Sequence, residues 1–176
     1  GDLWVGLFPS GVDYFDRSTA LFTNYVSVPH RADSLTPGGV LRFLPGSKGR
    51  LWIGTEGGLT AFDPAGQSFR RYQVEPRNPK GLRANAVLSL AADPNGDIWV
   101  GTWAGGLHRF DPQTGDFLHF GLEAGLGDAH IWSLLMDSGG RLWVGTENAG
   151  LHLYDRDNNR FRRFEPDPAD PESLSF

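Results

Sequence analysis

The sequence predicts an all-β protein made of β-propeller blades, because one motif recurs along the chain, turn residues separate short apolar runs, and those runs are apolar on both faces. The motif is Leu or Ile, Trp, Val or Ile, then Gly, and its four copies surround Trp4, Trp52, Trp99 and Trp143. Successive tryptophans lie 48, 47 and 44 residues apart. A repeat of about 47 residues has the length of one four-stranded blade.

The composition supports this fold class and excludes several functions. The chain holds 24 Gly and 12 Pro together with 12 Phe, 6 Trp and 4 Tyr, which is typical of many turns around a packed aromatic core. The formal net charge of -5 and the scattered basic residues argue against a nucleic-acid partner. The absence of cysteine excludes disulfides and thiolate metal sites. No apolar run approaches the roughly 18 residues of a membrane span, so we expect no membrane contact by this segment.

The third copy of the repeat shows the four strands most clearly. We predict them at Val87 to Ala92, Ile98 to Thr102, Leu107 to Phe110 and Phe117 to Phe120. Asp93-Pro94-Asn95-Gly96 and Asp111-Pro112-Gln113-Thr114-Gly115 separate strands in this copy. In each, Pro fixes φ and Gly supplies a position with φ above zero, so both indicate tight hairpins.

The strand segments are apolar on both faces, as in Leu142-Trp143-Val144. A sheet with one wet face would alternate apolar and polar residues, so these sheets must be covered on both sides, as blades are by their neighbours. No window has the spacing of an amphipathic helix, which disfavours a helical solenoid. The predicted partial propeller spans residues 1–176: a partial blade 1 at 1–33, complete blades at 34–80, 81–124 and 125–170, and the start of another at 171–176.

One family resemblance rests on Gly140-Arg141-Leu142-Trp143-Val144-Gly145-Thr146, followed by Gly150-Leu151 and Tyr154-Asp155. This run resembles the two-component regulator propeller repeat. The second copy departs from the pattern by carrying Pro45-Gly46 where an acidic residue is usual. The resemblance implies a ligand-sensing segment of a bacterial signalling receptor, periplasmic or otherwise extracytoplasmic, with no catalysis of its own and no cofactor.

The four repeat tryptophans are interpreted as structural core between blades. Ligands of propellers usually meet the mouth of the central channel, so residues of the loops there are the candidates for binding. The candidate ligand-binding residues are Glu56, Arg83, Asn85, Trp103, Asp128, His130, Glu147 and Asn148. Trp132 also stands outside the repeat register, in place of Leu41 and Leu88. An aromatic face beside carboxylates and amides suits a small polar ligand such as a carbohydrate.

Metal and catalytic motifs are not evident along the chain. No pair of histidines has the spacing of a ligand cluster, and the equivalent positions of His108 and His152 indicate a strand surface rather than a metal site. We therefore predict no metal and no catalytic residue. There is no Gly-x-Ser-x-Gly elbow, and a linear sequence cannot show whether carboxylates from different blades meet.

Two further functions stay open beside sensing. The first is a structural or self-assembling propeller fragment, natural or engineered. The chain starts in mid-pattern and holds too few blades for an ordinary ring, so we expect exposed blade faces to favour self-association, with a second copy closing the ring. The second is an enzyme similar to the streptogramin lyases, which use His and Glu at the channel mouth in metal-dependent elimination. Only His130 lies on a suitable loop, which disfavours that function.

Overall fold

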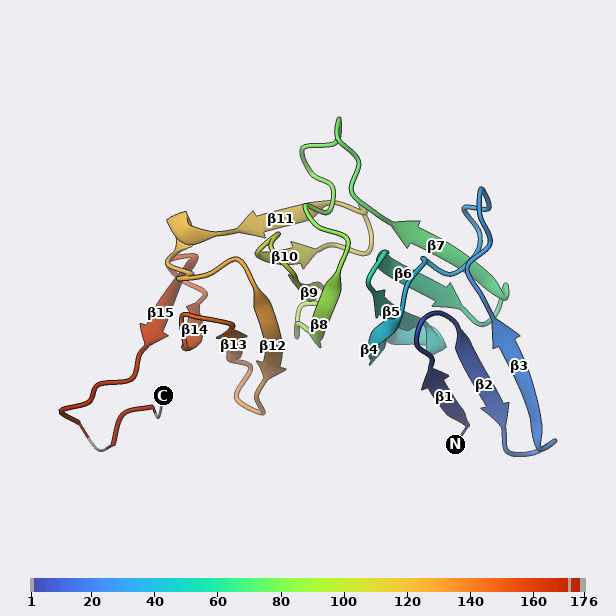
Figure 1. The fold of residues 1–176 in the computed structure, drawn as a ribbon, viewed down its shortest axis with the longest axis horizontal. Coiled ribbons are helices and arrows are strands. Elements are labelled where there is room, and N and C mark those ends of the chain that lie inside the picture. The colour runs from blue at the N-terminus through green and yellow to red at the C-terminus, as the bar shows by residue number, and fades with distance from the viewer. Residues whose placement is uncertain (1, 171, 175–176) are drawn as a thin grey trace.

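The computed structural model describes residues 2–170 and 172–174, and these residues form four antiparallel β-sheets and no α-helix (Figure 1). The predicted all-β propeller architecture is confirmed. The predicted start of a further blade, 171–176, includes residues 171, 175 and 176, which lie outside the described part of the chain. No helix among the described residues is long and apolar enough to cross a membrane.

The strands of each sheet follow one another in the sequence. The first sheet contains β1 (Leu3–Gly6), β2 (Val12–Asp16) and β3 (Leu21–Tyr25), and the second contains β4 (Val40–Pro45), β5 (Leu51–Thr55), β6 (Gly58–Asp63) and β7 (Ser68–Tyr72). The third contains β8 (Val87–Ala92), β9 (Ile98–Thr102), β10 (Leu107–Phe110) and β11 (Phe117–Phe120), and the fourth contains β12 (Ile131–Met136), β13 (Leu142–Thr146), β14 (Leu151–Asp155) and β15 (Arg160–Phe164). The four predicted strands of the third copy are confirmed.

The turns between strands have the predicted chemistry. The Asp93 N–H donates to Asp97 O at 2.9 Å and closes the β8–β9 turn, where Gly96 has φ +98. In the β10–β11 turn, the Asp111 N–H donates to Asp116 O at 3.0 Å and Gly115 has φ +83. These two glycines provide the left-handed backbone that a tight hairpin requires.

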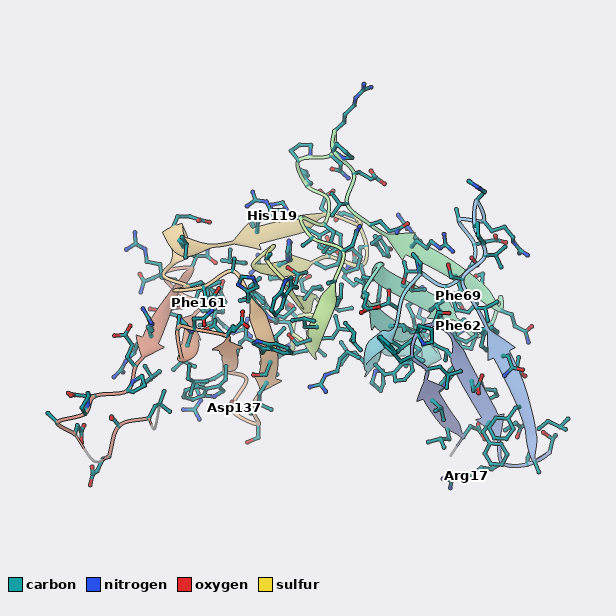
Figure 2. The ribbon with its side chains drawn as sticks, in the orientation of Figure 1. Arg17, Phe62, Phe69, His119, Asp137 and Phe161 are labelled. Carbon is teal, nitrogen blue, oxygen red and sulfur yellow. The ribbon has the colours of Figure 1, made fainter. Side chains whose placement is uncertain are left out.

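The sheets lie side by side, with the N-terminal sheet at one end of the row and the C-terminal sheet at the other (Figure 1). Each junction between neighbouring sheets is an apolar core in which one repeat tryptophan meets an aromatic residue of the following sheet. The ring centroids are 5.2 Å apart for Trp4 and Phe62, 5.4 Å for Trp52 and Phe110, and 4.9 Å for Trp99 and Tyr154, all edge to face. Figure 2 shows Phe62 beside Phe69 in the first of these junctions.

The glycine two residues after Trp4, Trp52 or Trp99 lets the next sheet approach. A Cβ on Gly54 would lie 2.8 Å from Val87 Cγ1, and a Cβ on Gly101 would lie 2.6 Å from Ile131 Cγ2. Both distances are shorter than carbon atoms tolerate, so any side chain there would push the inner strand of the following sheet away. The Trp-x-Gly pattern of the repeat therefore allows close packing at the junctions between sheets.

The first and last sheets each have one face that no other described sheet covers. On the first sheet this face carries Phe15 and Phe22, whose rings are 4.7 Å apart, and the exposed Leu3. On the fourth sheet it carries Trp143, which is half-buried, and the exposed Leu135. Trp52 and Trp99, in contrast, are buried, because a following sheet packs against each of them. We call the two uncovered surfaces the Phe15 face and the Trp143 face.

Candidate functional site

Three loops at one edge of the sheets hold equivalent positions. After the second strand of each complete sheet, one backbone N–H donates to a carbonyl in the segment leading to the inner strand. The pairs are Glu56 N to Gly39 O at 3.1 Å, Trp103 N to Ala86 O at 2.9 Å and Glu147 N to His130 O at 3.1 Å. These bonds fix which side chains of different blades correspond, and they place Trp103 and Glu147 in the same structural position.

Asp128 organises the loops of the fourth sheet. Its Oδ1 accepts the His130 backbone N–H at 3.0 Å and lies 2.8 Å from His130 Nδ1. Its Oδ2 accepts the backbone N–H of Asn148 at 2.8 Å and the side-chain amide at 3.0 Å. Burial opposes ionisation, but the hydrogen bonds from His130 and Asn148 dominate and hold the pKa of Asp128 well below its usual range. Asp128 is thus an anchored carboxylate between two loops.

Glu147 completes a polar group that we call the Asp128 cluster: Asp128, His130, Glu147 and Asn148. Glu147 Oε2 lies 3.8 Å from His130 Nδ1. The side chains of Asp128, His130 and Glu147 are 10%, 28% and 35% exposed, respectively. The cluster is therefore accessible at one side while its Asp128 end is held inside the loops.

Two exposed tryptophans stand beside this cluster. The Trp103 ring centroid lies 4.4 Å from that of His130 and 5.6 Å from that of Trp132, both edge to face. Trp103 is 40% exposed and Trp132 is 51% exposed. Trp132 occupies a register shift of the β12–β13 pair, between Ile131 and Ser133, and such a bulge redirects a side chain out of the sheet.

The repeat itself does not require the Asp128 cluster. In the third sheet, the positions of Asp128, His130 and Asn148 are occupied by Ala84, Ala86 and Ala104; in the second, they are occupied by Pro37, Gly39 and Gly57. Those two sheets form the same strands without the polar side chains. The cluster is therefore an addition to the common blade, and loop additions on a rigid scaffold are where binding residues are usually found.

The other predicted binding residues lie elsewhere. Glu56 Oε2 accepts the Gly39 N–H at 2.9 Å and braces two loops of its own sheet, whereas Asn85 Oδ1 accepts the Val74 N–H at 2.7 Å within one loop. Within the described part of the chain, no hydrogen bond or ion pair joins Glu56, Arg83 or Asn85 to the Asp128 cluster. The structure thus brings together Trp103 with the four cluster residues.

The prediction that His108 and His152 lie on a strand surface was wrong. Both are fully buried, in β10 and β14. His108 Nε2 accepts the Arg83 N–H at 3.3 Å, and His152 Nε2 accepts the Gly127 N–H at 3.1 Å. Burial lowers the pKa of His108 to about 3, so the ring is neutral and serves as an acceptor. Each ring therefore fixes the loop that leads to the inner strand of its own sheet.

Comparison with known proteins identifies the repeat. The family model described as two component regulator propeller matches residues 81–104 and 125–148, which contain the inner strand and the second strand of the third and fourth sheets. Both matched segments extend into the loops that carry Trp103 and the Asp128 cluster. A search of curated protein sequences finds no match to this chain.

Solved structures share the fold over nearly the whole chain. The extracellular domain of a hybrid two-component system from B. thetaiotaomicron is 25% identical, with a TM-score of 0.82 over 94% of this chain and 23% of that one. A second such domain, described as one-component, is 23% identical, with a TM-score of 0.75 over 99% of this chain and 22% of that one. A streptogramin B lyase is 17% identical, with a TM-score of 0.68 over 98% of this chain and 53% of that one.

Two of these solved structures are too distant in sequence to indicate more than the fold. At 17% and 23% identity, the lyase and the second extracellular domain show the fold alone. This chain spans about a quarter of the length of the extracellular domains that it matches. Two segments of this chain therefore match the two-component regulator propeller repeat, and the chain shares the propeller fold of these extracellular domains.

Proposed function

We propose that this chain is a ligand-sensing segment of an extracytoplasmic propeller in a bacterial signalling receptor. It binds a small polar ligand such as a carbohydrate at Trp103, Trp132 and the Asp128 cluster, and it catalyses no reaction. The observation that carries the proposal is the exposed tryptophan pair beside anchored polar groups that the blade fold does not need. The resemblance to the extracellular domain of a hybrid two-component system supports the location and the sensing role.

The chemistry of the site suits a hydroxylated ligand. The indole rings offer flat apolar area, while Glu147 and Asn148 present exposed carboxylate and amide groups for hydroxyl hydrogen bonds. A sugar has both an apolar ring face and a rim of hydroxyls. Few convergent polar groups beside aromatic surface are typical of small-molecule sites.

The Trp103→Ala variant is expected to weaken saccharide binding about tenfold or more, because a tryptophan that forms the apolar wall of a site usually dominates its binding energy. Isothermal titration calorimetry with a panel of neutral and acidic oligosaccharides, in buffer containing EDTA, measures this change. The matched control is Leu122→Ala, which removes an exposed apolar side chain that is not part of the proposed site and should leave affinity unchanged. Binding by no member of the panel, or equal binding by Trp103→Ala, would refute the proposal.

A second function, self-assembly, is favoured by the uncovered faces of the end sheets. Trp143 is equivalent to Trp4, Trp52 and Trp99, and Phe15 is equivalent to the aromatic residues on which those three pack. The Trp143 face of one copy is therefore complementary to the Phe15 face of another. Such a head-to-tail contact closes a ring when the rotation allows it, and two copies would supply about eight blades.

Light scattering across a concentration series tests this assembly. We expect the mass to approach twice 19.3 kDa as concentration rises. The Trp143→Ala variant should stay at the single-chain mass, because it removes the aromatic contact of the Trp143 face. Trp132→Ala, which removes an exposed tryptophan outside that face, should assemble as the unmodified chain does. A single-chain mass at every concentration would exclude self-assembly.

A further inference from the structure

The Asp128 cluster has a property that saccharide recognition does not require: three different metal-ligating side chains converge on one point. Asp128, His130 and Glu147 each offer one ligand atom, and these atoms lie within 4.8 Å of one another. We propose that these three residues bind a divalent transition-metal ion, with Zn²⁺ as the representative ion. The inference concerns the metal alone and is independent of the proposed ligand.

The distances are compatible with a tetrahedral ion. Zn²⁺ bonds to nitrogen and oxygen at about 2.0–2.2 Å, which places neighbouring tetrahedral ligands about 3.3 Å apart. His130 Nδ1 is 2.8 Å from Asp128 Oδ1 and 3.8 Å from Glu147 Oε2, so the observed separations lie on either side of that value. Glu147 is exposed and can adjust its rotamer to close the longer gap. Three protein ligands leave a fourth position open to solvent.

The donor set selects the class of ion. An imidazole nitrogen with carboxylate oxygens suits Zn²⁺, Ni²⁺ or Cu²⁺, whereas Ca²⁺ and Mg²⁺ prefer oxygen ligands in greater number. When an ion occupies His130 Nδ1, the neutral ring carries its proton on Nε2, and the ion replaces the contact between Nδ1 and Asp128.

The surroundings already orient two of the ligands. The backbone N–H and the side-chain amide of Asn148 both donate to Asp128 Oδ2, which leaves Oδ1 directed toward His130. Trp103 packs edge to face with the His130 ring and limits its rotation. Such outer contacts are what hold metal ligands in place, and their loss commonly costs about 10–100-fold in affinity. The spacing of metal ligands along the sequence does not reveal this site. Glu147 and His130 are 17 positions apart and come together only because β12 pairs with β13.

The repeat provides an internal control. Glu56 stands at the same position of the second sheet as Glu147, yet the positions opposite it hold Gly39 and Pro37 in place of His130 and Asp128. A carboxylate in this loop is therefore common to two blades, whereas the histidine and the aspartate occur with it only in the fourth sheet. Among the described residues, Glu56 is therefore a single carboxylate without neighbouring ligands, whereas Glu147 belongs to a set of three metal-ligating side chains.

The test is a calorimetric titration of the metal-free chain with ZnCl₂ alone at pH 7, without any saccharide. We expect one ion per chain, with the dissociation constant raised about tenfold or more in His130→Ala and in Glu147→Gln. Glu56→Gln, the matched control, and His30→Asn, which removes an exposed histidine in another loop, should bind as the unmodified chain does. Co²⁺ should give the visible absorption of a tetrahedral ion, and His130→Ala should abolish it.

Two results would overturn this inference. One is the absence of Zn²⁺ binding in the unmodified chain. The other is Zn²⁺ binding that His130→Ala leaves intact, which would mean that the ion sits elsewhere on the surface. Far-ultraviolet circular dichroism of each variant shows whether the fold is retained, so that lost binding is assigned to the site. Saccharide binding is measured in EDTA, so failure of either hypothesis leaves the other testable.

Discussion

Replacing Trp99 by alanine is expected to lower the free energy of unfolding by about 3–5 kcal/mol. Trp99 is fully buried in the junction of the third and fourth sheets, with its ring centroid 5.3 Å from that of Phe120 and 4.9 Å from that of Tyr154. Its Nε1 also donates to Asp93 Oδ2 at 2.6 Å. The substitution leaves a cavity and removes the donor of a buried carboxylate, and both effects destabilise the fold.

Urea unfolding followed by circular dichroism measures this loss. Trp99→Phe should recover part of it, because the aromatic contact with Tyr154 survives while the hydrogen bond to Asp93 does not. Trp132→Ala is the control: its exposed side chain should cost no more than about 0.5 kcal/mol. A loss below about 1 kcal/mol for Trp99→Ala would show that the junction core is not what stabilises the sheets.

Acid is expected to destabilise the chain through His108. The pKa of this ring is lowered by burial from 6.5 to about 3 in the folded state. Above pH 6.5 the ring is neutral in both states, and its contribution to stability is fully present. Between pH 6.5 and about 3, the unfolded chain binds a proton that the folded chain does not, so stability falls with falling pH. The slope is about 1.4 kcal/mol for each pH unit, which gives about 3 kcal/mol by pH 4.5.

Urea unfolding between pH 7.5 and 4.5 tests this linkage. His108→Gln retains an oxygen that can accept the Arg83 N–H but cannot take up a proton in this range, so its stability should depend less on pH. The comparison isolates His108 from the carboxylates, most of whose titration lies below this window. Parallel pH profiles for His108→Gln and the unmodified chain would refute the assignment.

The strands could be predicted because their limits are set locally. Asp93 and Gly96 form the turn before β9, and Gly115 lies in the turn after β10. These residues favour turns by their own backbone preferences, so the sequence alone predicts where the two strands begin and end. Burial of His108 and His152 could not be predicted in this way. Each ring accepts a backbone N–H from the loop that leads to the inner strand of its own sheet, and a repeated position in the sequence does not show this contact.

The candidate site was predictable in part. Trp103, Asp128, His130, Glu147 and Asn148 were expected on mouth loops, and the structure brings them together. The grouping itself depends on backbone bonds between loops that are distant in sequence, such as that from Glu147 to His130. Glu56 and Asn85 also lie on loops at this edge and are polar, but each accepts a backbone N–H away from the cluster residues, which a sequence pattern does not reveal.

The strand order has a consequence for how the chain folds. Every strand pairs only with its neighbours in the sequence, so each sheet assembles by successive hairpin formation without a distant partner. Strand pairing between sequence neighbours favours faster folding than an all-β topology built on distant strand pairs. Because the junction cores join only adjacent sheets, the chain resembles a one-dimensional array with nearest-neighbour coupling. The two central sheets, which have a neighbour on each side, should therefore unfold last, and the end sheets should fray first.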